Sequence, residues 1–422
     1  MDVIAGLLEG VPLPRMVPVA QDFPRPAMGD IEVYLRGEIE KGAYFQGIKP
    51  GSEIAIAVGS RGISNLGIII KTLADEIRHR GMIPFIVPAM GSHAGATAAG
   101  QKAMLEGLGV GASAVGAEIR ASMEATNLGS SPLGLPVYID ANAAAAGGIV
   151  VVNRIKPHVC FRGPYESGLM KMITIGLGKQ VGADFCHRLG FERMAEHIPD
   201  IGIAAISKSN ILLGVGILEN AYHETAKISC MRGTEIPRQE PLLLEEARTL
   251  SARLYFDSLD TLIIDEIGKD ISGAGFDTNV VGRYHSPCLS GGPRISRVGI
   301  LDISEKSKGN GNGLGMADFI AKRARGKFDF EQTYPNTLTA TLTGAVKIPM
   351  TLANDRLVIQ ACVKVAGLTD QRKVRLVRIR NTLSLGRIDV SESLLDEVAC
   401  HPNMRVLGPP ADFAFDGIGN LF

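Results

Sequence analysis

Short apolar runs alternate with longer amphipathic segments through the first half of the chain. Runs of small and branched residues predict buried strands at residues 54–58, 84–88, 135–139 and 149–152. Apolar side chains at helical spacing predict helices at residues 31–41, 65–80 and 96–108. Strands that alternate with helices in this way predict an α/β domain, with an open, mostly parallel sheet and flanking helices.

The pattern changes in the second half. Residues 201–232 predict an antiparallel hairpin, and residues 241–255 predict an amphipathic helix that leads out of the first domain. Further strands are expected at 259–267 and 298–303 and within 346–362 and 373–380, with a helix at 316–325. The domains are expected at residues 1–256 and 257–405, the second being a smaller α/β domain. Residues 406–422 are expected to dock back as a tail, and the active site is expected in the cleft between the domains.

Composition narrows the class of protein. In 422 residues, Lys and Arg number 44 and Asp and Glu number 44, so nothing in the charge suggests a nucleic-acid partner. No apolar run is long enough to cross a membrane, and the start of the chain does not resemble a signal peptide. The six Cys are scattered without CxxC pairs, as is typical of a reduced compartment, so a cytoplasmic protein is expected.

Two strand-to-helix turns share a pattern of Gly, Ser and a cationic or titratable side chain. The first reads Gly59-Ser60-Arg61-Gly62, and the second reads Gly91-Ser92-His93. Two parallel strands of one sheet would present Arg61 and His93 at the same edge, where ligands of open α/β sheets bind. Helix capping beside an unrelated charge is the alternative reading of each turn.

The segment that follows the strand at 149–152 carries most of the remaining chemistry. It contains Arg154, Lys156, His158 and Arg162, and it continues to Lys171 and His187. Lys171 lies between Met170 and Met172 in a helical stretch, and a desolvated amine can act as a nucleophile or an attachment point. On spacing alone, Lys171 could equally extend to the surface, and the two His could be ordinary polar residues. Cys160 lies two residues beyond His158, so a Cys–His pair is also possible.

Taken together, these motifs resemble the nickel-dependent lactate racemase family, best over residues 54–187. Ser60-Arg61 resembles that family's Thr-Arg turn, and Gly91-Ser92-His93 resembles its Gly-Thr-His turn. Pro157-His158 matches its Pro-His pair. Lys171 stands at the position of the Lys that carries the cofactor, and His187 at the position of the His that binds nickel.

The resemblance implies an isomerase that racemises or epimerises a small-molecule 2-hydroxy acid. The cofactor would be a nickel-pincer nucleotide, supplied by cofactor-synthesis enzymes and attached covalently to Lys171, with Ser60 in the cofactor site and His187 binding nickel. His93 and His158 would be the two bases that serve opposite enantiomers, and Arg61 would hold the carboxylate.

The departures from the family concern the substrate. Val58 stands where the family has an acidic residue, and the stretch between His158 and Lys171 is longer, with Arg162, Tyr165 and Glu166 as extra polar groups. We therefore expect a larger or more polar acid than lactate, such as malate or a sugar acid. Two alternatives stay open: a non-catalytic protein that binds an organic acid or nucleotide, and a Schiff-base enzyme that uses Lys171.

Overall fold

The computed structural model describes residues 3–422, apart from the side chains at 336, 339 and 340. The chain forms two compact units. One is Arg25–Ser251, and the other combines residues up to Pro24 with Ala252–Phe422. The boundary expected after residue 256 lies close to the end of the first unit, but the first 24 residues belong to the other unit and not to the N-terminal one.

The unit Arg25–Ser251 is built on a six-stranded sheet in the order β4-β3-β2-β7-β8-β9. All neighbours are parallel except β8 and β9, which form the expected antiparallel hairpin. Its strands are β2 (Glu53–Val58), β3 (Ile83–Pro88), β4 (Glu118–Ile119), β7 (Gly148–Arg154), β8 (Ile211–Glu219) and β9 (Thr225–Arg232). The strand expected at 135–139 is β6 (Pro136–Asp140), which pairs with β5 (Ala125–Ser130) in a separate two-stranded sheet.

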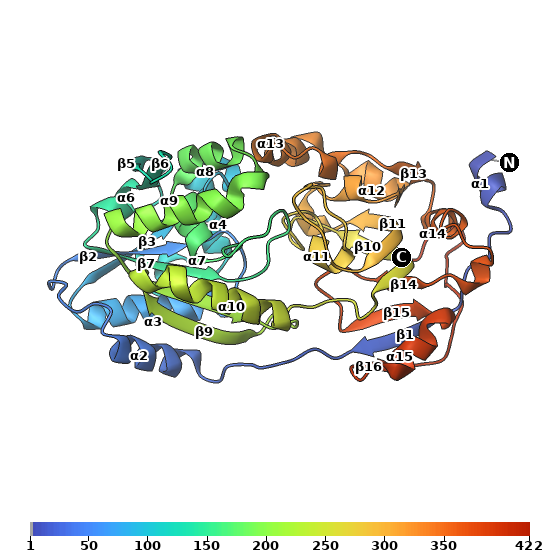
Figure 1. Ribbon diagram of the computed structural model, residues 1–422, viewed down its shortest axis with the longest axis horizontal. Helices are drawn as coiled ribbons and strands as arrows, with labels where there is room; N and C mark the ends of the chain where they lie inside the picture. Colours follow the sequence, from blue (N-terminus) through green and yellow to red (C-terminus); the bar gives the residue numbers. More distant parts are fainter. Residues whose placement is uncertain (1–2) are drawn as a thin grey trace. The chain divides into compact units, whose positions relative to one another are not determined.

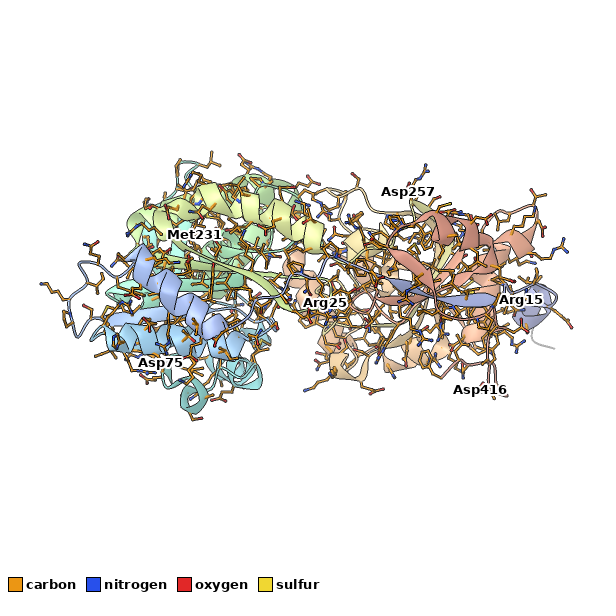
Figure 2. The ribbon with its side chains drawn as sticks, turned by 90° about the horizontal axis from the view of Figure 1, so that it is seen from below. Arg15, Arg25, Asp75, Met231, Asp257 and Asp416 are labelled. Atoms are coloured by element: carbon orange, nitrogen blue, oxygen red, sulfur yellow. The ribbon has the colours of Figure 1, made fainter. Side chains whose placement is uncertain are left out.

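Helices cover both faces of the six-stranded sheet (Figure 1). They are α2 (Ile31–Gly42), α3 (Leu66–His79), α4 (Ala98–Gly107), α5 (Ala112–Val115), α6 (Ala141–Ala145), α7 (Leu169–Lys171), α8 (Lys179–Arg188), α9 (Met194–Lys208) and α10 (Ile236–Leu250). Alternation along β2 explains the two cores: Ile54 and Ile56 pack with α2 and α3, and Ala55 and Ala57 pack with α7 and α9. Figure 2 draws the side chains as sticks, with Asp75 marking α3 and Met231 marking β9.

The other unit has an eight-stranded sheet in the order β13-β12-β11-β10-β14-β15-β1-β16. Its strands are β1 (Met16–Gln21), β10 (Ser258–Ile267), β11 (Arg294–Ile303), β12 (Phe319–Ala321), β13 (Met350–Leu352), β14 (Leu376–Ile379), β15 (Arg387–Ser391) and β16 (Met404–Val406). The helices are α1 (Val3–Leu8), α11 (Thr278–Val281), α12 (Lys322–Lys327), α13 (Phe330–Ala340), α14 (Asp355–Lys364) and α15 (Leu395–Cys400). The strands from β13 to β14 are parallel, and β15, β1 and β16 extend them in antiparallel pairs.

Two expectations for this unit were wrong, and one strand was not expected. No strand is expected before residue 31, but β1 fills the gap between β15 and β16. The helix expected at 316–325 begins only at Lys322, after the short strand β12. Part of the strand material expected at 346–362 is helix α14, where Asn354 caps the first turn and an apolar face, including Val358 and Cys362, joins the core.

The last residues of the chain pack on the same unit. Ala411 bridges Met16, and the Leu407 N–H donates to the carbonyl of Pro18. Phe413, Phe415 and Leu421 pack against the core that α14 helps to form. Within the described residues, no helix is both long and apolar enough to span a membrane.

Candidate functional site

The exit turns of three adjacent parallel strands, β3, β2 and β7, meet at one edge of the sheet. Ser60 follows β2 and His93 follows β3, and the Ser60 hydroxyl lies 2.5 Å from His93 Nδ1. The sheet therefore joins two of the residues singled out in the sequence. A hydroxyl can donate or accept, so His93 Nδ1 can carry its proton and donate to Ser60 while Nε2 remains a proton acceptor.

The segment that bears Lys171 is fixed against the end of β3. After α7, the chain forms a π-helical turn, η2 (Met172–Gly176). The Gly91 N–H donates to the Gly176 carbonyl over 3.1 Å. A Cβ at Gly176 would lie 2.6 Å from the carbonyl oxygen of Ala89, so glycine permits this approach. π-Helical turns are rare and often occur at functional sites.

The long stretch before Lys171 is a closed loop. Lys156 and Ser167 form a bridge at its base. The Lys156 N–H donates to the Ser167 carbonyl, with nitrogen and oxygen 2.9 Å apart, and the Ser167 N–H donates to the Lys156 carbonyl at 3.1 Å. The buried Glu166 carboxylate fills the loop: it accepts from the His158 N–H over 2.6 Å and pairs with Arg248 at 2.6 Å. The greater length is thus absorbed in a compact turn that fixes the position of His158.

Two of the three polar groups expected to contact a substrate are used by the fold. Glu166 has no exposed side-chain surface, and the Tyr165 hydroxyl donates to the Pro237 carbonyl over 2.7 Å. The expectation that Glu166 and Tyr165 read the substrate is therefore wrong. Arg162 keeps 31% of its side chain exposed, although it also donates to the His158 carbonyl over 2.7 Å.

Lys171 and His158 are in direct contact, with Nζ 2.5 Å from Nε2. The Cys160 N–H donates to His158 Nδ1 over 3.0 Å, so that nitrogen carries no proton in the neutral ring. The ring proton is then on Nε2, which faces Lys171. Because two protonated nitrogens cannot share a hydrogen bond, the contact requires an uncharged amine on Lys171 that accepts from His158.

The surroundings favour that uncharged amine. Lys171 keeps some exposed surface, but burial of its amine lowers the pKa to about 8, and the charges of Arg61 and Lys156 act in the same direction. Burial, together with the charge of Lys171, holds the pKa of His158 well below its usual value. The centroid of the Phe161 ring lies 4.4 Å from the centroid of the His158 ring and 5.7 Å from Lys171 Nζ. Phe161 therefore places an apolar surface beside both groups.

Arg61 lies in a region of positive charge. The Arg61 residue is exposed to solvent. Burial of its guanidinium group among protein atoms, and then the nearby charge of Arg154, lower its pKa. Arg154 itself is paired with Glu219, which also accepts from the Ser64 N–H over 2.7 Å. The charge of Arg154 is thus partly offset, and a carboxylate near Arg61 would be attracted chiefly by Arg61 itself.

His187, near the end of α8, presents a buried ring nitrogen. Its ring stacks on Phe191 with a centroid distance of 5.6 Å, and Nδ1 has no hydrogen-bond partner. Burial, with a smaller effect from the charge of Lys171, lowers the pKa of His187 to about 4, so the ring is neutral near pH 7. Within the described residues, no three His, Cys, Asp or Glu side chains gather as a metal site. His187 thus offers one imidazole ligand rather than a complete metal centre.

Glu240 of α10 was missed by the sequence reasoning. It is 1% exposed, and its Oε2 accepts from the Met170 N–H over 2.8 Å, directly before Lys171. A signal was present in the sequence, because Glu240 lies on the apolar stripe of α10 with Ile236, Leu243, Leu244 and Ala247. An acidic residue within such a stripe indicates a specific buried partner.

Residues 26–197 match the family model of the lactate racemase N-terminal domain. All six candidate residues lie in this segment, so fold and segment together define an α/β protein with a lactate racemase-like N-terminal unit. A solved structure, the lactate racemase apoprotein from Thermoanaerobacterium thermosaccharolyticum, is similar with a TM-score of 0.52 and 14% identity. The similarity covers 88% of this chain and 99% of that chain, which confirms the predicted two-part α/β fold and the predicted resemblance. No curated protein matches the chain.

Proposed function

We propose that the protein is a racemase or epimerase of a 2-hydroxy acid that uses a nickel-pincer nucleotide attached to Lys171. His93 and His158 serve as the proton-transferring residues, Arg61 binds the substrate carboxylate, and His187 binds nickel. Ser60 belongs to the same site and orients His93. Enzymes that synthesise the cofactor would be the protein's partners during its maturation.

One observation carries the proposal: Lys171 Nζ lies 2.5 Å from His158 Nε2, and this contact requires an uncharged amine. An uncharged amine is the form that attacks a carbonyl-type carbon. With a pKa of about 8, Lys171 reaches this form at a lower pH than an ordinary lysine, and a lysine with only a structural role would gain nothing from that.

The residues present also fit the cofactor. Its attachment requires an amine with a lowered pKa, which Lys171 supplies. His187, whose buried Nδ1 has no hydrogen-bond partner, would supply the protein's nitrogen ligand to the nickel. When bound, the cofactor supplies a group that takes up hydride from C2 of the substrate and returns it.

The chain's own residues would bind the acid and move its hydroxyl proton. The positive field of Arg61, Lys156 and Arg162, whose charges act on His158 or Lys171, favours an anionic substrate. His93 Nε2 can accept a hydroxyl proton while Nδ1–H donates to Ser60. His158 holds a proton at Nε2 while Lys171 is an amine. A Lys171 nitrogen that has been acylated is no longer an acceptor, so His158 is then released to exchange its proton with substrate.

The test is a panel of single stereoisomers of 2-hydroxy acids, including lactate, malate and sugar acids, incubated with protein from a host that makes the cofactor. We expect the epimer of at least one acid to form, with the more polar acids faster than lactate. His187→Ala should lose nickel, whereas His93→Ala should keep nickel and lose most turnover. Lactate as the fastest substrate would overturn the substrate preference.

The alternatives give different results in the same experiment. A binding protein would take up no mass on Lys171 and would turn over no acid. A Schiff-base enzyme would be trapped on Lys171 by borohydride in the presence of a keto acid, without nickel. Either result would contradict the proposal.

A further inference from the structure

The helix that carries Lys171 is too short to hold its own position. α7 spans only Leu169–Lys171 and passes directly into the π-helical turn η2. The first amides of a helix have no partner within it, and a three-residue helix contributes little stability of its own. The position of the Lys171 amine therefore depends on the contacts that neighbouring elements make with residues 168–171, above all the hydrogen bonds to their backbone.

Glu240 of α10 supplies that partner. Its Oε2 accepts from the Met170 N–H over 2.8 Å, and the Leu169 amide also interacts with the carboxyl group. α7 and α10 lie side by side in the unit, far apart in sequence (Figure 1). The Glu240 carboxyl group thus replaces the local capping side chain that Gly168 cannot provide.

Gly168 leaves room for the Glu240 carboxyl group. A Cβ at Gly168 would overlap Glu240 Oε1, so glycine lets the carboxyl group reach the amides. The Gly168 carbonyl in turn accepts from Asn153 Nδ2 over 2.8 Å and from the Met172 N–H over 3.1 Å. The turn before Lys171 is therefore held at both its N–H and its carbonyl groups.

Glycines in two further elements receive the side chains on either side. A Cβ at Gly214 of β8 would lie 3.0 Å from Leu169 Cδ1, and a Cβ at Gly202 of α9 would lie 2.7 Å from Met170 Cε. Apolar packing thus fixes the depth of α7, but packing of this kind is not directional. Hydrogen bonds are directional, and the bond to Glu240 is the one made by Met170, directly before Lys171, so it constrains the rotation of α7 and the direction of Lys171.

Burying this carboxyl group is costly. Burial raises the pKa of Glu240 to about 8, against the opposing effect of the two amides. Oε1 has no hydrogen-bond partner, and Glu240 forms no ion pair in the described part of the chain. An apolar residue would fill the same stripe of α10 without that cost, so the carboxyl group is explained by what it does for α7.

We infer that Glu240 is a positioning residue, which holds the Lys171 amine against His158 so that the cofactor can be attached. The inference deepens the proposed function and rests on it for the identity of the attached group. The placement of the amine itself can be measured without any cofactor. The required property is an acceptor oxygen at the Glu240 position, so Gln should replace Glu240 and Leu should not.

The experiment is competitive acetylation of the folded protein by trace acetic anhydride from pH 6 to 11, read at Lys171 and at the exposed Lys102 by peptide mass spectrometry. Anhydride acylates the uncharged amine: the C–N bond forms, the C–O bond breaks, and acetate leaves as the amine loses a proton. The comparison uses wild type, Glu240→Gln, Glu240→Leu and Gly168→Ala, with Leu244→Val as a control that disturbs the same buried face of α10.

We expect Lys171 in wild type and Glu240→Gln to acetylate with the same pH midpoint. In Glu240→Leu and Gly168→Ala the amine should leave its site and regain an ordinary midpoint. Each unit of increase in the pKa of Lys171 reduces the uncharged fraction about tenfold, so labelling near pH 7 should fall about tenfold or more relative to Lys102. Leu244→Val should leave the Lys171 profile unchanged even where it lowers thermal stability.

Three results would overturn the inference: Lys171 labelling in Glu240→Leu equal to wild type, an equal loss in Leu244→Val, or an equal loss in Glu240→Gln. If Glu240→Leu does not fold, Gly168→Ala provides the same test, because its added methyl group displaces the Glu240 carboxyl group from the amides. If instead wild type labels as expected but gains no cofactor mass in a host that makes it, the proposed function fails, and the positional role of Glu240 stands.

Discussion

Two lysines eight residues apart in the same unit are buried in opposite ways. Lys179, at the start of α8, has no exposed side-chain surface; its Nζ lies 2.7 Å from the Asp140 carboxylate and donates to the Pro88 carbonyl over 2.8 Å. The approach to Asp140 is poorly angled for a hydrogen bond, so the attraction there is mainly electrostatic. Lys171 forms no ion pair in the described part of the chain, and its partner is a histidine.

The difference supports the proposal that Lys179 has a structural role and Lys171 a chemical one. A paired ammonium group such as Lys179 joins β3, β6 and α8, and its charge is compensated where it lies. The amine of Lys171 is pushed towards its uncharged form by burial and by the nearby charges of Arg61 and Lys156. Burial alone therefore does not indicate reactivity; burial without a carboxylate partner does.

The largest effect expected is on stability, from Lys179→Met. This change leaves the Asp140 carboxylate buried without its counter-charge, which should lower the free energy of unfolding by about 3–5 kcal/mol in urea titrations. The double variant Lys179→Met, Asp140→Asn should recover part of that loss, because no charge then remains buried. A loss below about 1 kcal/mol in the single variant would mean that the pair is not a structural lock.

Lys171→Met should act in the opposite direction and by less. The pKa of Lys171 is about 8 in the folded protein, against 10.5 for an ordinary lysine, so at neutral pH its ammonium form opposes folding. Its removal should raise the free energy of unfolding by about 1–3 kcal/mol at pH 7.

The pH dependence of that gain has a defined sign. Between pH 8 and 10.5 the unfolded chain binds more protons at Lys171 than the folded chain, so wild-type stability rises with pH in this window. The advantage of Lys171→Met should therefore be full below about pH 8 and vanish by pH 10.5. An advantage that is the same at pH 7 and pH 10.5 would show that the amine is not desolvated.

A smaller effect is expected from His158. His158→Gln keeps an N–H donor that can reach Lys171, whereas His158→Leu removes it. The net contribution of one such hydrogen bond is about 0.5–1.5 kcal/mol, so the pKa of Lys171 should rise by up to about one unit in His158→Leu alone. Nitrogen NMR of the labelled ring should also find the His158 proton on Nε2; a proton on Nδ1 would contradict the assigned direction of the contact.

The fold was predicted well where apolar runs and amphipathic helices alternate. The strands at 54–58, 84–88 and 149–152 and the helices between them follow from local periodicity, because each element buries one face or both against its neighbours. Strand β1 was missed because its pairing partners lie about 370 residues further along the chain, and its Pro-rich surroundings carry no local strand signal.

The site was predictable only in part, for the same reason. Arg61, His93, His158 and Lys171 stand at or after strand ends, and parallel pairing brings such ends together. The direction of the His158 ring proton depends on the Cys160 amide, and the position of α7 depends on Glu240, some 70 residues later. The roles of Tyr165 and Glu166 were misjudged because polar residues that stabilise a loop have the same composition as residues that bind a ligand.

The central proposal is that Lys171, and not Lys179, is the lysine to which the cofactor is attached. The direct test is intact mass, nickel content and peptide mapping of protein from a host that makes the nickel-pincer nucleotide. The account predicts one nickel per chain and one covalent addition, located on Lys171 and absent from Lys171→Met. An addition located on Lys179, or none on either lysine, would contradict it.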